Sequence, residues 1–234
     1  MSDTKQEKKF KSQLIVLEGP DGSGKTFQIE KLMTDYPGQF ERLKFPREES
    51  KAKIAAFLKQ MDQNSINDIM KYHFLFIQDI IDFQPELNEI LFRNRNKKHV
   101  LLDRYYFSSI VYLKFAIQKF YQPNKQIAYT KWHALLEQVL HKWINQCRTP
   151  DHVILLIDNF AEKEAGELQN HTHDELQEIN KLYKQEIDAY WQYLHKKHRG
   201  EFTWEQIEAL NKTEYFIQNY LHGHKIIEAV LAKQ

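Results

Sequence analysis

The sequence predicts an α/β fold, a three-layer, doubly wound parallel sheet with helices on both faces. Three short apolar runs have the length and composition of buried parallel strands, namely Leu14–Leu17, Val100–Leu102 and Val153–Ile157. Leu43–Phe45 is a candidate fourth strand. Longer segments with apolar residues at helical spacing separate these runs, and strands that alternate with helices are typical of this architecture. In such a sheet, ligands bind at the carboxyl ends of the strands.

The helices are predicted from apolar residues that recur every three or four positions. They are Phe27–Met33, Ile54–Met61, Ile66–Asn94, Ser108–Phe120, Tyr129–Asn145 and Leu176–His195. Pro85 predicts that the third of these ends or bends near Gln84, because proline lacks a backbone N–H donor. Residues 196–234 are expected to be mostly helical, with a short strand or loop near Gly200–Trp204.

The length of 234 residues favours one domain, expected at residues 14–234, after a flexible tail at 1–13. A net charge of +1 gives no general argument for binding nucleic acid or an anionic membrane, and we expect neither partner. Cys147 is the only cysteine, which excludes an intrachain disulfide and a cysteine metal cluster. No apolar stretch has membrane-spanning length and no signal-peptide segment is present, so we expect a soluble cytoplasmic protein.

The strongest motif is Gly19–Thr26, which reads Gly-Pro-Asp-Gly-Ser-Gly-Lys-Thr and matches G-x-x-x-x-G-K-[ST]. It lies between a predicted strand and a predicted helix, the context in which this pattern binds phosphate. Its glycines let consecutive backbone N–H groups point into one anion-sized cavity, beside the positive end of the helix dipole. Lys25 would reach the β- and γ-phosphates of ATP, and the Thr26 hydroxyl would ligate Mg²⁺. The predicted ATP-binding residues are Asp21, Gly22, Ser23, Gly24, Lys25 and Thr26.

Charged residues also follow two other predicted strands. Asp103 comes directly after an apolar run, where it can hold Mg²⁺ directly or through water. Arg104, the next residue, can form a bidentate contact with a second phosphate. Arg47 would be a further phosphate contact. The cations Lys25 and Arg104 together suggest two phosphorylated substrates. The competing interpretation is an ordinary surface ion pair between Asp103 and Arg104.

With these residues the chain resembles the thymidylate kinase family, nucleoside monophosphate kinases of the phosphate-loop superfamily. Four segments carry the resemblance in family order: Leu17–Thr26, Phe45–Glu48, His73–Phe76, and Asp103–Tyr105 with Ser108 and Tyr112 beyond it. The likeness covers about residues 14–158 and is faint afterwards.

The resemblance implies an acceptor site whose residues come from three of these segments. Asp21 would face the acceptor sugar and phosphate, while Arg47 and Arg104 would hold that phosphate. Phe76 would stack on the thymine, although an ordinary core aromatic is the competing interpretation. The other implied acceptor residues are Tyr105 near the deoxyribose, Ser108 near the base, and Phe45.

The chain departs from the family pattern at two places. The arginine that hydrogen-bonds thymine in the family is replaced by Ile80, which weakens the argument for thymine specificity. The branch of the family that lacks an arginine in the phosphate loop supplies arginines from a lid instead. The lid expected near 159–175 contains Lys163 but no arginine, so Lys163, Arg148 and Arg199 are candidate substitutes. His171 and His173 also allow a zinc hypothesis, but a solvated loop is the favoured interpretation.

The sequence therefore predicts a kinase that moves the γ-phosphoryl group of ATP to a (deoxy)nucleoside monophosphate, in the first place dTMP to dTDP. Lys25, Asp103 and Arg104 are the predicted catalytic residues, with Thr26 and Asp103 at Mg²⁺. No general base is needed, because the acceptor phosphate oxygen is already anionic. Two alternatives stay open, a kinase for another (deoxy)nucleotide and a nucleotide-binding or regulatory protein with little or no catalysis. A homodimer through the apolar faces of 66–94 and 108–120 is a candidate assembly.

Overall fold

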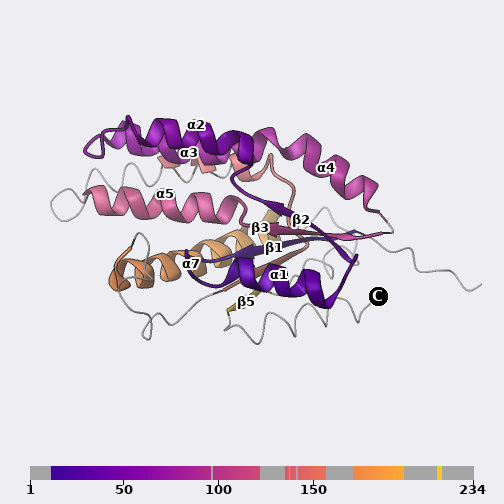
Figure 1. Ribbon diagram of the computed structural model, residues 1–234. Coiled ribbons are helices and arrows are strands. Elements are labelled where there is room, and N and C mark those ends of the chain that lie inside the picture. The colour runs from indigo at the N-terminus through magenta and orange to yellow at the C-terminus, as the bar shows by residue number, and fades with distance from the viewer. Residues whose placement is uncertain are drawn as a thin grey trace, which may run out of the picture.

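Five parallel strands form one sheet in the order β2-β3-β1-β4-β5 (Figure 1). The strands are β1 (Leu14–Glu18), β2 (Phe40–Lys44), β3 (His99–Asp103), β4 (His152–Leu155) and β5 (Tyr215–Ile217). The computed structural model describes residues 12–95, 97–121, 135–136, 138–140, 142–156, 171–197 and 215–217. The chain runs from β1 to the edge strand β2, returns to β3 beside β1, and then continues on the other side of β1 with β4 and β5, so the predicted doubly wound parallel sheet is confirmed.

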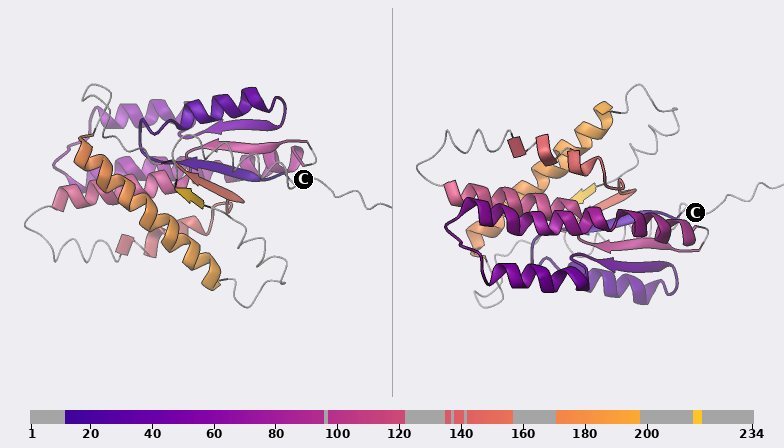
Figure 2. Two further views of the ribbon diagram at one scale, coloured as in Figure 1. Left: turned by 90° about the horizontal axis from the view of Figure 1, so that it is seen from below. Right: turned by 90° about the horizontal axis from the view of Figure 1, so that it is seen from above.

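The helices are α1 (Lys25–Asp35), α2 (Glu48–Leu58), α3 (Ile66–Asp82), α4 (Gln84–Arg93), α5 (Tyr106–Tyr121) and α7 (His173–Lys197). α3 packs against α5, and α7 crosses α5 obliquely (Figure 2). Among the described residues, no helix combines the length and apolar character needed to cross a membrane.

Strand β1 shows why the apolar runs are continuous rather than alternating. Leu14 and Val16 pack into a core shared with α3, α4, α5 and α7, whereas Ile15 and Leu17 pack against Ile29 and other residues of α1. Both faces of the strand are thus covered, and all of its residues are buried. These two cores are the contacts that hold the three layers together.

The break at Pro85 is confirmed. α3 ends at Asp82 and α4 begins at Gln84, which places the proline in the first turn of the new helix. There its missing N–H would have had no partner within the helix. Pro37 and Gly38 form a turn between α1 and β2.

The prediction is less accurate at the edges of the sheet. β2 begins at Phe40 rather than Leu43 and ends at Lys44, because this edge strand is only partly buried and carries polar residues that hide its periodicity. α2 begins at Glu48, six residues before the first apolar position used to predict it. The helical expectation for 196–234 is wrong at Tyr215–Ile217, which pairs with β4.

Several predictions fall wholly or partly on residues that are not described. They are the tail at 1–13, of which only residues 12 and 13 are described, the first part of the helix expected at Tyr129–Asn145, the strand or loop near Gly200–Trp204, and most of the lid near 159–175.

Helix α4 allows a test of the packing. Leu87 is fully buried against the sheet, whereas Phe92 on the same helix is 74% exposed. Leu87→Ala should lower the free energy of unfolding by about 2–5 kcal/mol because it leaves a cavity, while Phe92→Ala should change it by less than about 0.5 kcal/mol. Urea unfolding of both variants measures the difference; equal effects would contradict this orientation of α4.

Candidate active site

The loop between β1 and α1 is shaped by glycines at the carboxyl end of the sheet. Gly19 has a φ of +139°, and a Cβ added to it would lie 2.2 Å from the carbonyl oxygen of Leu156. Gly24, with a φ of +85°, is the left-handed residue from which α1 begins. Only glycine fits the first position, so the course of the loop depends on the motif residues themselves.

Lys25 folds back over this loop. Its ammonium group donates hydrogen bonds to the carbonyl oxygens of Gly19 (2.9 Å) and Pro20 and to the Ser23 hydroxyl (3.2 Å). Burial, helped by the nearby positive charge of Arg104, lowers the pKa of Lys25 to about 7. A positive charge is therefore poorly solvated here, and an anionic ligand would stabilise it.

Asp103 and Arg104 lie beside the loop because β3 pairs with β1. The Asp103 carboxylate is buried and lies 3.4 Å from the Thr26 hydroxyl. The backbone N–H of Arg104 donates to the Leu17 carbonyl (3.0 Å), and Arg104 has a φ of +69°. A non-glycine residue in this region is strained, and such strain is concentrated at functional sites.

The Arg104 side chain reaches back to the loop that follows β1. Its guanidinium forms an ion pair with Asp21 and donates to the carbonyl oxygen of Gly19 and the hydroxyl of Ser108, both at 2.9 Å. It also lies over the ring of Tyr112, 5.8 Å from its centroid. The structure thus shows direct side-chain contacts between two segments that the sequence analysis had placed at the same edge of the sheet.

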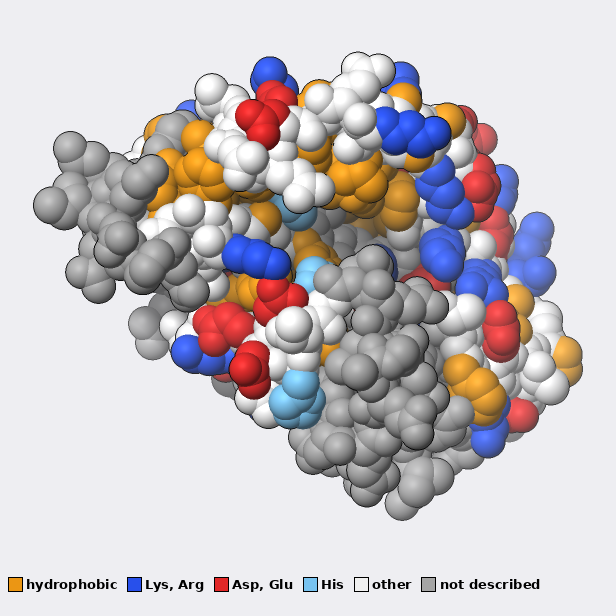
Figure 3. Space-filling view, turned by 60° about the vertical axis from the view of Figure 1, so that its left-hand side comes forward, with side chains coloured by type: hydrophobic (Ala, Val, Ile, Leu, Met, Phe, Trp, Pro, Cys, Tyr) orange, Lys and Arg blue, Asp and Glu red, His pale blue; other side chains and the backbone are white. Residues whose placement is uncertain are grey.

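A cavity of about 660 Å³ opens at this end of the sheet. Figure 3 looks onto it as a hollow with hydrophobic side chains and histidines in its walls. Its volume is within the range of small-molecule sites. The lining residues include Asp21, Lys44, Phe45, Tyr72, His73, Phe76, Ile80, Arg104, Tyr105, Ser108, Tyr112 and His171.

The two ends of the cavity differ in character. Asp21, Arg104 and Lys44 supply charge near the loop and Lys119 supplies a further charge from α5, whereas α3 contributes apolar and aromatic side chains, among them Phe76 and Ile80. Burial lowers the pKa of His73, another α3 residue, to about 4, so this imidazole is neutral at physiological pH. Such a cavity suits a ligand with an anionic end and an aromatic end.

Arg47 is the predicted acceptor residue that does not line the cavity. Its Nε lies 2.7 Å from Oδ1 of Asp79, and its backbone N–H donates to Oδ2 (2.9 Å). A guanidinium nitrogen is also 2.6 Å from Glu49. Phe45, Phe76, Tyr105, Ser108, Asp21 and Arg104, by contrast, all lie at the cavity.

The candidates for a lid cation and for a zinc site gain little support. Lys163 and Arg199 are outside the described residues, and Arg148 does not line the cavity. No group of three metal-ligating side chains occurs among the described residues. His171 instead lines the cavity and stacks on Tyr112, with ring centroids 5.9 Å apart.

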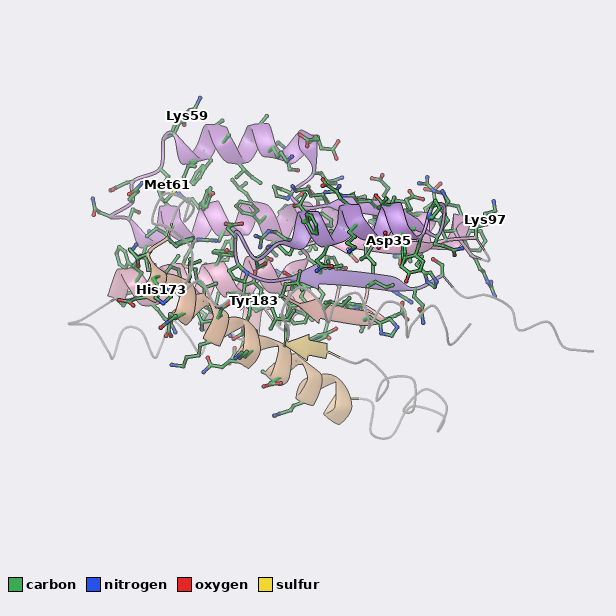
Figure 4. The ribbon with its side chains drawn as sticks, turned by 60° about the horizontal axis from the view of Figure 1, so that its bottom comes forward. Asp35, Lys59, Met61, Lys97, His173 and Tyr183 are labelled. Carbon is green, nitrogen blue, oxygen red and sulfur yellow. The ribbon has the colours of Figure 1, made fainter. Side chains whose placement is uncertain are left out.

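The sequence analysis missed the side chains that hold Arg104 in place. Glu18 is fully buried and accepts hydrogen bonds from the backbone N–H groups of Tyr105 (2.8 Å) and Ser108 (3.3 Å) and from the Ser108 hydroxyl. Tyr183, near the middle of α7 (Figure 4), places its hydroxyl 2.8 Å from that of Ser108 and 3.3 Å from Arg104. Glu18 could have been predicted as a site residue, because it is a charged residue directly after an apolar run. No local sequence pattern indicates a role for Tyr183.

Figure 4 labels residues at two opposite ends of the molecule. Met61 and His173 lie at one end, and Asp35 and Lys97 lie at the other. The loop, the cavity and the Glu18 network all belong to the carboxyl end of the strands, as expected for a sheet of this type.

Comparisons with known proteins agree with this geometry. A family model described as thymidylate kinase matches residues 17–215. A thymidylate kinase structure from Candida albicans, described as revealing the origin of broad substrate specificity, has a TM-score of 0.61 and 16% identity, covering 96% of this chain and 94% of its own. One from Ehrlichia chaffeensis has a TM-score of 0.52 and 17% identity, covering 96% and 99%. No curated protein sequence matches the chain. At these identities the solved structures show the shared fold.

The buried carboxyl group of Glu18 generates a prediction about pH. Burial raises its pKa from 4.5 to about 7, although the Ser108 hydroxyl and the Arg104 charge favour the ionised form. The folded protein therefore holds this proton more tightly than the unfolded chain does. The resulting stabilisation is complete below pH 4.5 and is lost as the pH rises to 7, a change of about 3 kcal/mol.

Glu18→Gln stays neutral and should gain that amount of stability relative to wild type between about pH 4.5 and about pH 8. Urea unfolding of both proteins across this range measures it, with Glu89→Gln, an exposed position on α4, as the matched control. A difference between Glu18→Gln and wild type that does not vary with pH would contradict a proton held at Glu18.

Proposed function

The chain belongs to the thymidylate kinase family, whose function is phosphotransfer to dTMP, and we propose that it uses ATP and Mg²⁺ for this transfer. One observation carries the proposal: Lys25 and the phosphate loop lie beside the Arg104–Asp21 pair at the charged end of a nucleotide-sized cavity. The loop would then bind the donor phosphates next to Arg104, which would bind the acceptor phosphate.

The donor would be held by the loop between β1 and α1. Its backbone N–H groups and the amino-terminal end of α1 would bind the phosphates of ATP, with Lys25 exchanging its loop carbonyl partners for phosphate oxygens. Thr26 and Asp103 present hard oxygen donors 3.4 Å apart, the ligand type that Mg²⁺ prefers, so these residues fit the ion. When bound, Mg²⁺ would neutralise charge on the β- and γ-phosphates.

The acceptor would lie in the cavity with its phosphate at Arg104 and its base at α3. Phe76 would stack on the base, while Tyr105 and Phe45 would contact the nucleoside. Arg104 and Asp21 would orient the acceptor phosphate toward the γ-phosphate. Catalysis would then consist of positioning and charge stabilisation.

Ile80 supports looser base selection than an arginine would give. It lines the cavity, is only 2% exposed and has no donor for a base edge. Acceptance of other monophosphates beside dTMP is therefore part of the proposal. The alternative without catalysis gains no support from the described residues.

Assembly and location stay predictions. The apolar faces of α3 and α5 pack largely into the core of the protomer, which accounts for them without a dimer. A cytoplasmic location is likewise an expectation from the sequence.

Coupled ADP release tests the proposed function. With ATP, Mg²⁺ and a panel of dTMP, dUMP, dCMP and dGMP, we expect turnover on dTMP and measurable turnover on another pyrimidine. Lys25→Ala should abolish turnover, whereas Lys31→Ala, exposed on the same helix, should not. Tight binding of ATP and dTMP without ADP release would favour a regulatory protein, and full activity of Lys25→Ala would overturn the site.

Replacing Arg104 tests the acceptor end. Arg104→Ala should raise the KM for the monophosphate roughly 10- to 100-fold, the loss expected for hydrogen bonds to a charged group, and leave ATP affinity nearly intact. Steady-state kinetics and ATP titration measure the two effects, with Arg93→Ala on the exposed side of α4 as control. An effect confined to ATP would place Arg104 at the donor instead.

A further inference from the structure

Resting on the proposed function, we propose that Lys44, rather than Arg47, is the second cation that contacts the acceptor phosphate. Neither the family match nor the sequence motifs assign this residue. The proposal concerns the charged end of the cavity already described, and four observations lead to it.

Lys44 is the last residue of β2 and lies at the carboxyl end of the sheet. In the sheet it pairs with Asp103, and Asp103 in turn pairs with Leu17 at the end of β1. Its side chain lines the cavity together with Asp21 and Arg104. Strand pairing thus places the Lys44 backbone one strand away from the segment that carries Arg104.

The Lys44 ammonium group is also close to the proposed metal ligands. Nζ is 3.9 Å from Oδ2 of Asp103, and that oxygen is 3.4 Å from the Thr26 hydroxyl. A cation at this place is close to both the acceptor phosphate and the group being transferred. Lysine suits such a position because it acts as a compact point charge on a flexible stem.

Arg47 and Lys44 differ in how easily they can turn to a ligand. Turning Arg47 away would leave the Asp79 carboxylate, which is 1% exposed, with the Ser50 hydroxyl as its remaining side-chain donor among the contacts described. Removing one partner of a buried ion pair is strongly destabilising, because it leaves an uncompensated buried charge. The Lys44 side chain is 49% exposed, and its 3.9 Å contact with Asp103 is long, so Lys44 can reorient with little loss of stability.

A further cation is needed at this end of the cavity to balance the charge of a bound monophosphate. The Arg104 guanidinium is already paired with the Asp21 carboxylate, so these two charges largely offset each other. A monophosphate brings close to two negative charges, which Arg104 alone would not balance. Two lysines among the described residues line the cavity, Lys44 and Lys119, and the Lys119 ammonium group is already paired with Glu175 at 2.5 Å.

The test separates the affinity due to the phosphate from the affinity due to the nucleoside. Calorimetry with dTMP and with thymidine gives, for each variant, the dissociation constant of thymidine divided by that of dTMP; if the panel selects another acceptor, that nucleoside and its monophosphate are used. Lys44→Met should reduce this ratio about 10-fold or more and leave nucleoside binding unchanged, and Lys44→Arg should restore most of it. Lys51→Met is the matched control, because Lys51 lies nearby on α2 and does not line the cavity.

The outcomes are distinguishable. The inference would be overturned, while the proposed function stands, if the ratio is unchanged in folded Lys44→Met. It would also be overturned if the ratio falls in Arg47→Met and not in Lys44→Met. Arg47→Met should instead weaken both ligands equally, since it leaves Asp79 without its ion pair next to Ile80, which lines the cavity. A wild-type protein that binds neither dTMP nor any other monophosphate would overturn the proposed function together with the inference.

Discussion

The arrangement of the site depends on one buried carboxyl group. Glu18 ends β1, and its side chain accepts hydrogen bonds from backbone N–H groups at the beginning of α5. It therefore ties the strand that leads into the phosphate loop to the segment that carries Arg104. The Leu17–Arg104 backbone hydrogen bond and the contacts of the Arg104 side chain with Gly19 and Asp21 connect the same two segments. A buried carboxyl group without these donors would be costly, so the link also specifies a single arrangement of both.

Features that depend on neighbouring residues could be predicted from the sequence. The glycines, Lys25 and Thr26 are constrained by the loop they form, and Pro85 acts on its own backbone, so local patterns were sufficient. The central strands were found because both of their faces are covered. The placement of Asp103 and Arg104 beside the loop followed from the parallel sheet that these strands imply.

Features that depend on distant partners could not be predicted in this way. Arg47 has the residue type of a phosphate ligand, but Asp79, 32 positions away, holds its guanidinium and backbone N–H. Tyr183 reaches Ser108 from a helix 75 positions further along the chain. The edge strands β2 and β5 lack the double burial that makes a strand visible as an apolar run, so one was shifted and the other missed. Side-chain pairing across the sheet is the information that a single sequence does not contain.

Lys25 gives the phosphate loop a further property near neutral pH. Because its pKa in the folded protein is about 7, the ammonium form accounts for only part of the molecules at that pH. An anionic ligand stabilises the ammonium form, so occupation of the loop would be accompanied by uptake of a fraction of a hydrogen ion from the solvent. Affinity of the loop for an anionic ligand would then weaken as the solution becomes more alkaline.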